Sequence, residues 1–355
     1  MLNVMKKYYK LITVVLVLLQ YSPRAYCQDV GFSQFYAQPL LRNPALAGIF
    51  EGDYRFFAMY RNQWQSVTVP YKTYALNAEV KFPLNIPDKD ITLTLGLQLL
   101  NDVAGTTQFS STQACPALNT SIGVGGNSYV SIGIMPGLMQ QRFDPTKVIL
   151  NDQFVSGSNG DFTIRPYSNQ TFKYSSLTFA DLSAGVSFNS SLADNVDYYV
   201  GVGFFHLLKP HAGFMNGDTI TLNKRLTFNA GLSSGVGDGD TLIFYGDYFG
   251  QYHGFFHYTG VGTFQAGVML RHALGVPNQA GKFITAGVLY RWDDAVIPVV
   301  QLELSKFVIG VSYDINVSKL VVAAQARGGV ELTLSYKDIF PSRNPYLRQV
   351  HCRVP

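Results

Sequence analysis

Residues 91–99 read Ile-Thr-Leu-Thr-Leu-Gly-Leu-Gln-Leu, an alternation of large apolar side chains with small or polar ones. Successive side chains of an extended strand point to opposite faces, so this stretch has one apolar face and one polar face. No stretch after residue 28 shows the amphipathic period of a helix over ten or more residues. The pattern therefore predicts a strand whose two faces meet different environments.

The same alternation recurs along the chain, for example at 182–188, 264–270, 307–313 and 330–336. A β-sandwich also alternates, but here the second face carries Gly, Ser, Thr and an occasional charge over strands of about ten residues. That length suits a tilted strand crossing about 25–30 Å of hydrocarbon, whereas soluble strands average about five or six residues. Because lipid offers backbone groups no partner, such strands predict a closed barrel.

Composition agrees with a sheet-rich protein in contact with lipid. The 355 residues are 47% hydrophobic and 14% aromatic but only 14% charged, and they include 33 Gly, 22 Tyr and 25 Phe. Soluble domains usually carry about 25% charged residues. The high apolar fraction also excludes a disordered chain.

The periodicity predicts an all-β fold, a transmembrane antiparallel β-barrel of about 14 strands within residues 54–336. The predicted strands are 54–61, 72–82, 91–101, 107–122, 128–139, 179–189, 196–206, 224–235, 240–249, 260–272, 281–291, 296–304, 307–316 and 328–336. An even number places both termini on the periplasmic side. The connections then separate into short inner turns and longer outer loops, the longest being 140–178 and 207–223.

Residues 1–27 have the pattern of a signal peptide. Lys6, Lys7 and Lys10 precede an apolar run at 11–19, and Ala25-Tyr26-Cys27 forms a small-x-small cleavage site. The mature chain is expected to start near Gln28 and to reach the cell outer membrane. The leader holds four of the 27 Lys and Arg, so 27 − 4 = 23 remain against 23 Asp and Glu, and nothing favours nucleic-acid binding.

Two segments flank the predicted barrel. Residues 28–53 are expected to form a periplasmic N-terminal lead-in, and residues 337–355 a basic C-terminal periplasmic tail containing Arg343 and Arg348. Either end could plug the lumen or reach a periplasmic partner. The two mature cysteines, Cys115 and Cys352, could form a disulfide or remain two thiols.

Several short motifs resemble, in order, those of the PorP/SprF family of type IX secretion system membrane proteins. The resemblance covers the chain from about residue 28 to residue 336. The motifs are Gly31-Phe32-Ser33-Gln34-Phe35-Tyr36, Asn43-Pro44-Ala45-Leu46-Ala47-Gly48, Tyr60-Arg61-Asn62-Gln63-Trp64, Asn101-Asp102-Val103-Ala104-Gly105, Gly201-Val202-Gly203, His206-Leu207-Leu208-Lys209-Pro210, Tyr290-Arg291 and Ser312-Tyr313-Asp314. One departure is the ending Cys352-Arg353-Val354-Pro355, where the family commonly has Cys-Pro.

The resemblance implies an outer-membrane component of the type IX secretion and gliding pathway. Its expected partners are a secreted surface protein or adhesin with a C-terminal signal domain, and periplasmic lipoprotein or ring components of the machinery. Outer-membrane lipid surrounds such a barrel. The alternative function is an outer-membrane porin or hydrophobic-solute transporter, because fourteen strands can enclose an open lumen.

Candidate partner-binding residues lie in these motifs and in the basic tail. Arg61, Gln63 and Trp64 form either a rim platform that grips a partner or, alternatively, part of the aromatic girdle with a snorkelling arginine. Asn43 and Pro44 form either a rigid turn closing the periplasmic mouth or a ligand site.

His206 and Pro210 mark either a structural corner or a contact site, since proline stops strand pairing.

Catalytic, metal and cofactor sites are not expected. His253 and His257 are four residues apart, a spacing that aligns metal ligands on a helix, but they lie in loop or strand. No zinc-peptidase, serine-hydrolase or nucleotide-binding motif is found in the sequence. The polar lumen residues Asp181, Arg271 and Arg291 are expected to pair across the barrel.

Overall fold

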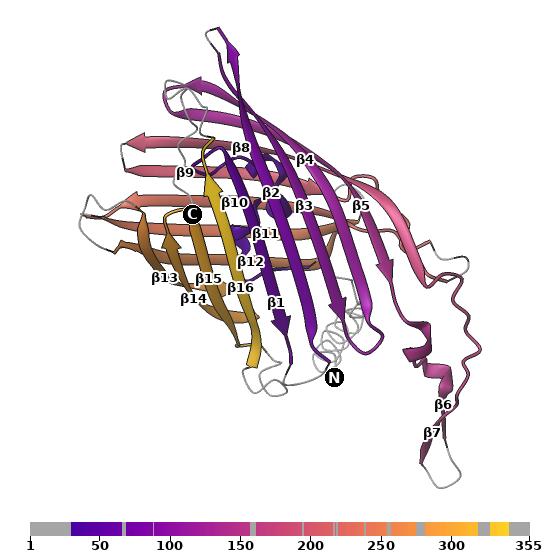
Figure 1. Cartoon of the computed structure of the whole chain (residues 1–355). Helices are drawn as coiled ribbons and strands as arrows, with labels where there is room; N and C mark the ends of the chain where they lie inside the picture. Colours follow the sequence, from indigo (N-terminus) through magenta and orange to yellow (C-terminus); the bar gives the residue numbers. More distant parts are fainter. Residues whose placement is uncertain are drawn as a thin grey trace, which may run out of the picture. The chain divides into compact units, whose positions relative to one another are not determined.

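The computed structural model describes residues 30–340 except 66–68, 88, 157–160, 194, 216, 218, 238, 254–256, 275–280 and 319–326. Contacts divide the chain into residues 1–30 and residues 31–355, and the second unit contains every element below. Fourteen strands of this unit close into one antiparallel barrel in which each strand pairs with its neighbours in sequence, and β16 pairs with β1 (Figure 1). The prediction of a 14-stranded barrel is therefore confirmed.

The barrel strands follow the chain in order. They are β1 (Tyr54–Gln63), β2 (Tyr71–Ile86), β3 (Lys89–Ala104), β4 (Phe109–Gly125), β5 (Ser128–Arg142), β8 (Ser176–Ala193), β9 (Val196–Phe205), β10 (Lys224–Gly235), β11 (Asp240–His253), β12 (His257–Ala273), β13 (Lys282–Arg291), β14 (Ala295–Leu304), β15 (Phe307–Asn316) and β16 (Arg327–Asp338). Each overlaps one predicted strand, and most extend a few residues further.

The remaining elements are short. They are η1 (Phe35–Ala37), α2 (Pro39–Arg42), η2 (Pro44–Leu46), η3 (Pro145–Lys147), η4 (Asn151–Gln153) and the small hairpin β6 (Phe154–Ser156) and β7 (Phe162–Ile164). The hairpin lies in the connection between β5 and β8 and was not predicted. None of the helices that the structure describes has the length and apolar character needed to cross a membrane.

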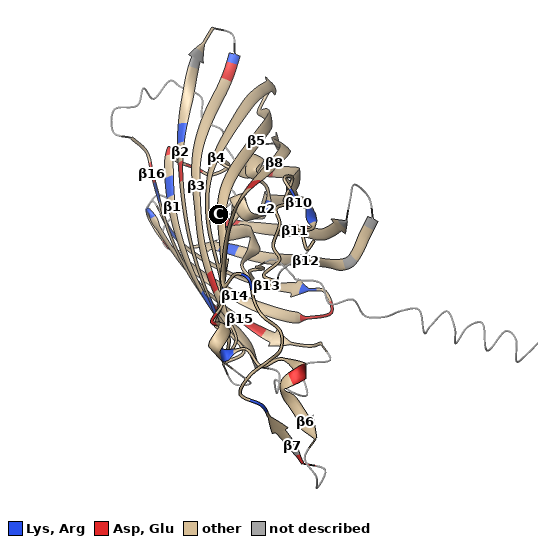
Figure 2. Ribbon diagram, turned by 90° about the vertical axis from the view of Figure 1, so that its right-hand side faces the viewer, with Lys and Arg blue, Asp and Glu red and all other residues tan. Residues whose placement is uncertain are grey.

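The two faces of the strands divide as the alternation predicts. On β3, Leu95 and Leu97 are 47% and 41% exposed on the outside, while Thr94 and Gln98 are 1% and 0% exposed. Lys, Arg, Asp and Glu are sparse along the strand ribbons (Figure 2). An apolar outer face over a polar interior is typical of a barrel that spans a bilayer.

The connections differ in length between the two ends of the barrel. At the end where β1 finishes, called here the loop end, β5 leads to β8 through residues 143–175 and β9 to β10 through 206–223. At the opposite end, called the turn end, β4–β5 and β14–β15 are joined by two residues each. The two longest connections lie at the loop end, as the sequence predicts.

Residues 31–53, called here the plug, lie inside the barrel. Phe35, Leu40, Asn43 and Phe50 are each at most 2% exposed although no described helix in the plug exceeds four residues. The sequence left open whether this segment plugs the lumen or meets a partner. The structure places residues 31–53 in the lumen.

Candidate functional site: the plugged lumen

A buried charge cluster lies near the loop end of the lumen. Arg61 of β1 is 3.0 Å from Asp314 of β15 and 3.2 Å from Glu331 of β16, and Arg291 of β13 is 2.6 Å from Asp314. All four residues are at most 7% exposed. The pairing compensates each charge, which is what burial of ionic groups requires.

The start of the plug is bound by this cluster. Glu331 accepts the backbone N–H groups of Ser33 and Gln34 at 2.6 and 2.8 Å. The Ser33 hydroxyl donates to Asp314, and Arg61 donates to the carbonyl of Gly31. Because Arg61 is near the end of β1, the plug begins close to the loop end.

Arg42 anchors the middle of the plug. Its guanidinium donates to both carboxylate oxygens of Asp247 on β11, each at 2.5 Å, and to the Tyr199 hydroxyl on β9 at 2.8 Å. Arg42 and Asp247 are 3% and 1% exposed. A two-point arginine–carboxylate pair fixes orientation as well as distance.

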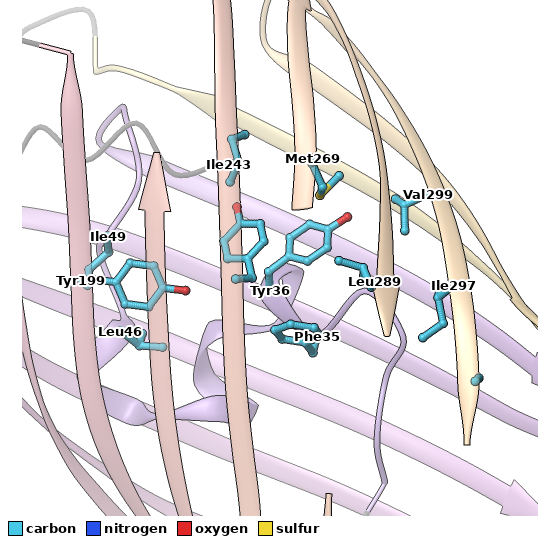
Figure 3. Packing of buried hydrophobic residues seen from close by; sticks show 12 residues of the cluster. Phe35, Tyr36, Leu46, Ile49, Tyr199, Ile243, Met269, Leu289, Ile297 and Val299 are labelled. Atoms are coloured by element: carbon cyan, nitrogen blue, oxygen red, sulfur yellow. The ribbon is translucent and has the colours of Figure 1, made fainter. Parts of the chain in front are cut away.

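Apolar packing accompanies this pair. Phe35 and Tyr36 project from the plug toward Ile243, Met269 and Leu289 on the strands (Figure 3). The Tyr36 ring stacks on Tyr245 with centroids 4.7 Å apart and planes 6° from parallel.

The Asn43-Pro44 turn fits against glycines of the wall. Asn43 caps η2 by accepting from Ala45 N–H at 2.9 Å and donates to the Val186 carbonyl at 3.0 Å. A Cβ at Gly133 would lie 2.4 Å from the Pro44 carbonyl carbon, and one at Gly185 would lie 1.9 Å from Asn43 Oδ1. The wall therefore needs glycine where the turn approaches it.

The end of the plug is bound at the turn end. Glu79 of β2 accepts the N–H of Gly48 at 2.8 Å and pairs with Arg55 at 2.7 Å. Lys81 donates to the Phe50 carbonyl at 2.6 Å, and its ammonium lies 4.5 Å from the centre of the Phe50 ring. The plug thus runs through the lumen from the loop end to the turn end.

The predicted residues of the first hairpin have different environments in the structure. Arg61 points into the lumen and is buried, with the Gln63 amide against its guanidinium. Trp64 follows β1 with a φ of 62° and stacks on Tyr71 at 5.6 Å. The structure therefore places Trp64 at the rim and Arg61 in the lumen, not in one shared platform.

The second predicted pair lies at the corner after β9. His206 has a φ of 58°, is 6% exposed, and its Nδ1 lies 2.7 Å from Asp181 Oδ2. Pro210 is buried, and its carbonyl accepts from the N–H of Leu222 within the same loop at 3.0 Å.

The remaining predicted residues are the arginines of the tail and the two cysteines. Arg343, Arg348 and Cys352 lie outside the described residues. Cys115 is buried among Leu40, Ala47, Met135 and neighbouring side chains.

The predicted lumen pairs form, but between strands on the same side of the wall. Arg271 of β12 is 2.8 Å from Glu303 of β14, and Arg291 of β13 pairs with Asp314 of β15. The expectation that these residues pair across the barrel was wrong, because the plug occupies the space between opposite walls.

The sequence analysis did not identify the acidic wall residues that bind the plug, which are Glu79, Asp247 and Glu331. A usable signal was present: each is an isolated carboxylate on the polar face of a strand, and Arg42 is the one charged residue among residues 31–50. Among the residues described, no group of three or more His, Cys, Asp or Glu could hold a metal ion.

The rim of the loop end is tied together by aromatic rings. Phe143 lies 4.8 Å from Phe172 and 5.0 Å from Phe214, and Phe109 lies 6.3 Å from Phe214, centroid to centroid. These contacts join the start of β4 to the loops 143–175 and 206–223. Hydrogen bonds from the Ser168 hydroxyl and a backbone N–H hold the pKa of Asp152, in the first of these loops, below its usual value.

Comparison with known proteins adds a family match. A family model described as type IX secretion system membrane protein PorP/SprF matches residues 25–336. No curated protein matches the sequence.

Solved structures with similar folds include three barrels at low identity. The CymD monoaromatic hydrocarbon channel is 10% identical with a TM-score of 0.47, over 89% of this chain and 95% of that one. A Pseudomonas aeruginosa FadL homologue is 10% identical with a TM-score of 0.47, over 86% and 96%. BamA from Haemophilus ducreyi lacking POTRA domains 1–3 is 8% identical with a TM-score of 0.43, over 80% and 70%.

Proposed function

The chain belongs to the PorP/SprF family of type IX secretion system membrane proteins, and from this premise we propose that it works in the cell outer membrane. There it assists secretion or surface anchoring of a large exported protein by binding the C-terminal signal domain of that protein. The leader at 1–27 delivers the chain, which carries no enzymatic activity. The loop end faces the cell exterior and the turn end faces the periplasm, as short periplasmic turns imply.

The occupied lumen is the observation that carries this proposal. A porin needs an open aqueous path, whereas here residues 31–53 bind the wall from the loop end to the turn end. With the lumen filled, the surfaces left for partners are the rim and the two ends of the barrel.

The loop-end rim has features of a protein contact surface. Phe154 and Ile164 of the β6–β7 hairpin are 49% and 52% exposed, and Tyr167 is 84% exposed. Exposed aromatic side chains serve as anchors in protein interfaces, and short hairpins offer free strand edges. The exported protein would bind here, while the basic tail meets periplasmic lipoprotein or ring components.

Affinity capture tests the proposal. The tagged barrel is isolated from its native membrane and its partners are identified by mass spectrometry. We expect an exported protein with a C-terminal signal domain, reduced several-fold by Tyr167→Ala in the rim. Lys282→Ala, an exposed substitution at the turn end, is the matched control and should leave capture of that protein unchanged. Recovery of neither an exported protein nor a secretion component would refute the proposal.

Single-channel conductance distinguishes the proposed function from the porin alternative. In a planar bilayer the full chain should stay closed, since the plug occupies the lumen. Steady, large single-channel currents from the full chain would instead favour a porin.

A further inference from the structure

We propose that the lumen wall is a binding track for the main chain of an irregular polypeptide segment supplied in trans, and that residues 31–50 occupy this track in cis until displaced. The inference rests on the proposed function only for the source of that polypeptide, which would be a segment of the exported protein. The incoming segment would resemble residues 31–50: low in charge, rich in small and apolar residues, with one basic side chain near its middle.

The first support is that the wall binds backbone groups of the plug rather than its side chains alone. Three N–H groups and six carbonyl oxygens of residues 31–50 are held by wall side chains. The N–H groups are those of Ser33, Gln34 and Gly48, and the carbonyls those of Gly31, Leu41, Arg42, Ala45, Ala47 and Phe50. Every polypeptide carries these groups, so such recognition is largely independent of sequence.

The second support is that the short helices of the plug satisfy only part of its backbone: seven backbone hydrogen bonds are internal to residues 31–50, and the wall binds other N–H and carbonyl groups. Its helices are three or four residues long, and buried backbone groups must find partners somewhere. The wall supplies those partners from Asn119, Ser187 and Thr227, among others. A wall of this kind suits an irregular chain that contains only short helical turns.

The third support is the shape of the wall. Gly133 and Gly203 lie where the plug main chain comes closest, and a Cβ at Gly203 would be 3.0 Å from the Arg42 carbonyl oxygen. Because these two residues have no side chain, a polypeptide main chain can lie directly against the wall at these positions. The wall can therefore accept any segment that has small residues opposite these two glycines.

One side chain adds selectivity. Asp247 is buried and receives two bonds from Arg42, so the track requires a basic group at this level. An incoming segment without one would leave the Asp247 charge buried and uncompensated.

Displacement is compatible with the chain connectivity. All barrel strands follow residue 53, so the plug is covalently joined to the wall only at the turn end. A tethered segment has an effective concentration of the order of millimolar, and a competitor must overcome it. Weakening the tethered copy should therefore strengthen binding of a free one.

The test uses a fluorescent peptide with the sequence of residues 31–50 and the full chain in detergent or nanodiscs, followed by fluorescence anisotropy. The wild-type barrel should bind this peptide weakly. The plug variant Arg42→Ala should bind it at least tenfold more tightly, because the wall site for arginine is then vacant. Lys147→Ala removes an exposed basic side chain from a loop and should bind like the wild type.

Two further measurements isolate the wall. On the Arg42→Ala barrel, a peptide that itself carries Arg42→Ala should bind at least tenfold more weakly, and adding Asp247→Asn to the barrel should have the same effect. If Arg42→Ala does not give the heat-modifiable band of a folded barrel, Asn43→Ala replaces it, because it removes the Val186 bond and the cap of η2.

No gain in affinity on weakening the plug, or equal binding of a scrambled peptide, would overturn the inference. The peptide derives from this chain, so the result is separate from affinity capture. Exchange of the peptide without capture of an exported protein would refute the proposed function alone, and capture without exchange would refute the binding track alone.

Discussion

Gly133→Ala is expected to destabilise the barrel by pushing the plug away from β5. The new Cβ would lie 2.4 Å from the carbonyl carbon of Pro44 and 2.6 Å from the nitrogen of Ala45, whereas ordinary contact begins at 3.4 Å. The plug must then retreat by 3.4 − 2.4 = 1.0 Å, since main-chain atoms cannot rotate aside. The bond from Ser187 to the Ala45 carbonyl, now 2.9 Å, would lengthen to about 3.9 Å and be lost.

The cost follows from these distances. A lost buried hydrogen bond removes about 1 kcal/mol, and overpacking adds about 1–3 kcal/mol, so the free energy of unfolding should fall by about 2–4 kcal/mol. Urea unfolding in lipid vesicles, followed by tryptophan fluorescence, measures it. With a slope of about 3 kcal/mol/M, the midpoint should fall by about 1 M.

Gly246→Ala is the matched control, because a Cβ at Gly246 of β11 meets no atom within 4 Å. Its midpoint should stay within about 0.3 M of the wild type, as small surface substitutions usually do. Equal midpoints for the two variants would show that the plug does not press on Gly133 in solution, and the packing argument would fail.

Further substitutions test other parts of the molecule. Phe214→Ala should raise the rate of proteolytic cleavage within 143–175 severalfold, measured by mass spectrometry, because it removes two ring contacts of the rim. The lowered pKa of Asp152 means that its loop bonds stabilise above the unfolded pKa of about 4 and are lost as pH falls through the folded value, so hydrogen exchange in that loop, corrected for intrinsic rates, should accelerate at pH 2.5 but not at pH 5. Cys115 should react with a maleimide far more slowly in the folded barrel than in urea, in a background lacking the other cysteines. Ile134→Arg, on the outer face of β5, should lower the free energy of unfolding by about 2–4 kcal/mol in vesicles, and an unchanged urea midpoint would contradict a lipid-facing position.

The strands could be predicted from sequence because their signal is local. Alternation over residues 91–99 reports the two faces of β3 whatever the rest of the chain does, and the same holds for every strand in the barrel. The hairpin β6–β7 could not be predicted because strands of three residues contain too few alternating positions to be recognised in the sequence.

The plug and its partners could not be predicted for the opposite reason. Ser33 and Glu331 are separated by 298 residues, and Arg42 and Asp247 by 205. No local pattern links residues at such separations. The Asn43-Pro44 turn lies against glycines within β5, β8 and β9 and not at the mouth of the barrel, and these glycines resemble any other small residue of a polar strand face.

Arg61 and Trp64 show how neighbouring residues of one motif can have separate roles. The alternation on β1 turns Arg61 inward to the charge cluster, whereas the positive φ of Trp64 redirects the chain and lays its ring on Tyr71. Residue type alone suggests one shared role for Arg61 and Trp64, whereas the backbone geometry places their side chains in different environments.

The distribution of the plug contacts has a consequence for biogenesis. Ser33 and Gln34, which precede every described strand, bind the last two strands of the barrel through Asp314 and Glu331, while Gly48 binds the second strand through Glu79. A nascent chain released before β16 would lack Glu331, so the N–H groups of Ser33 and Gln34 would lose this acceptor. The plug can thus act as an internal template for assembly of the barrel, so that pairing of β16 with β1 and binding of the start of the plug occur in a single step.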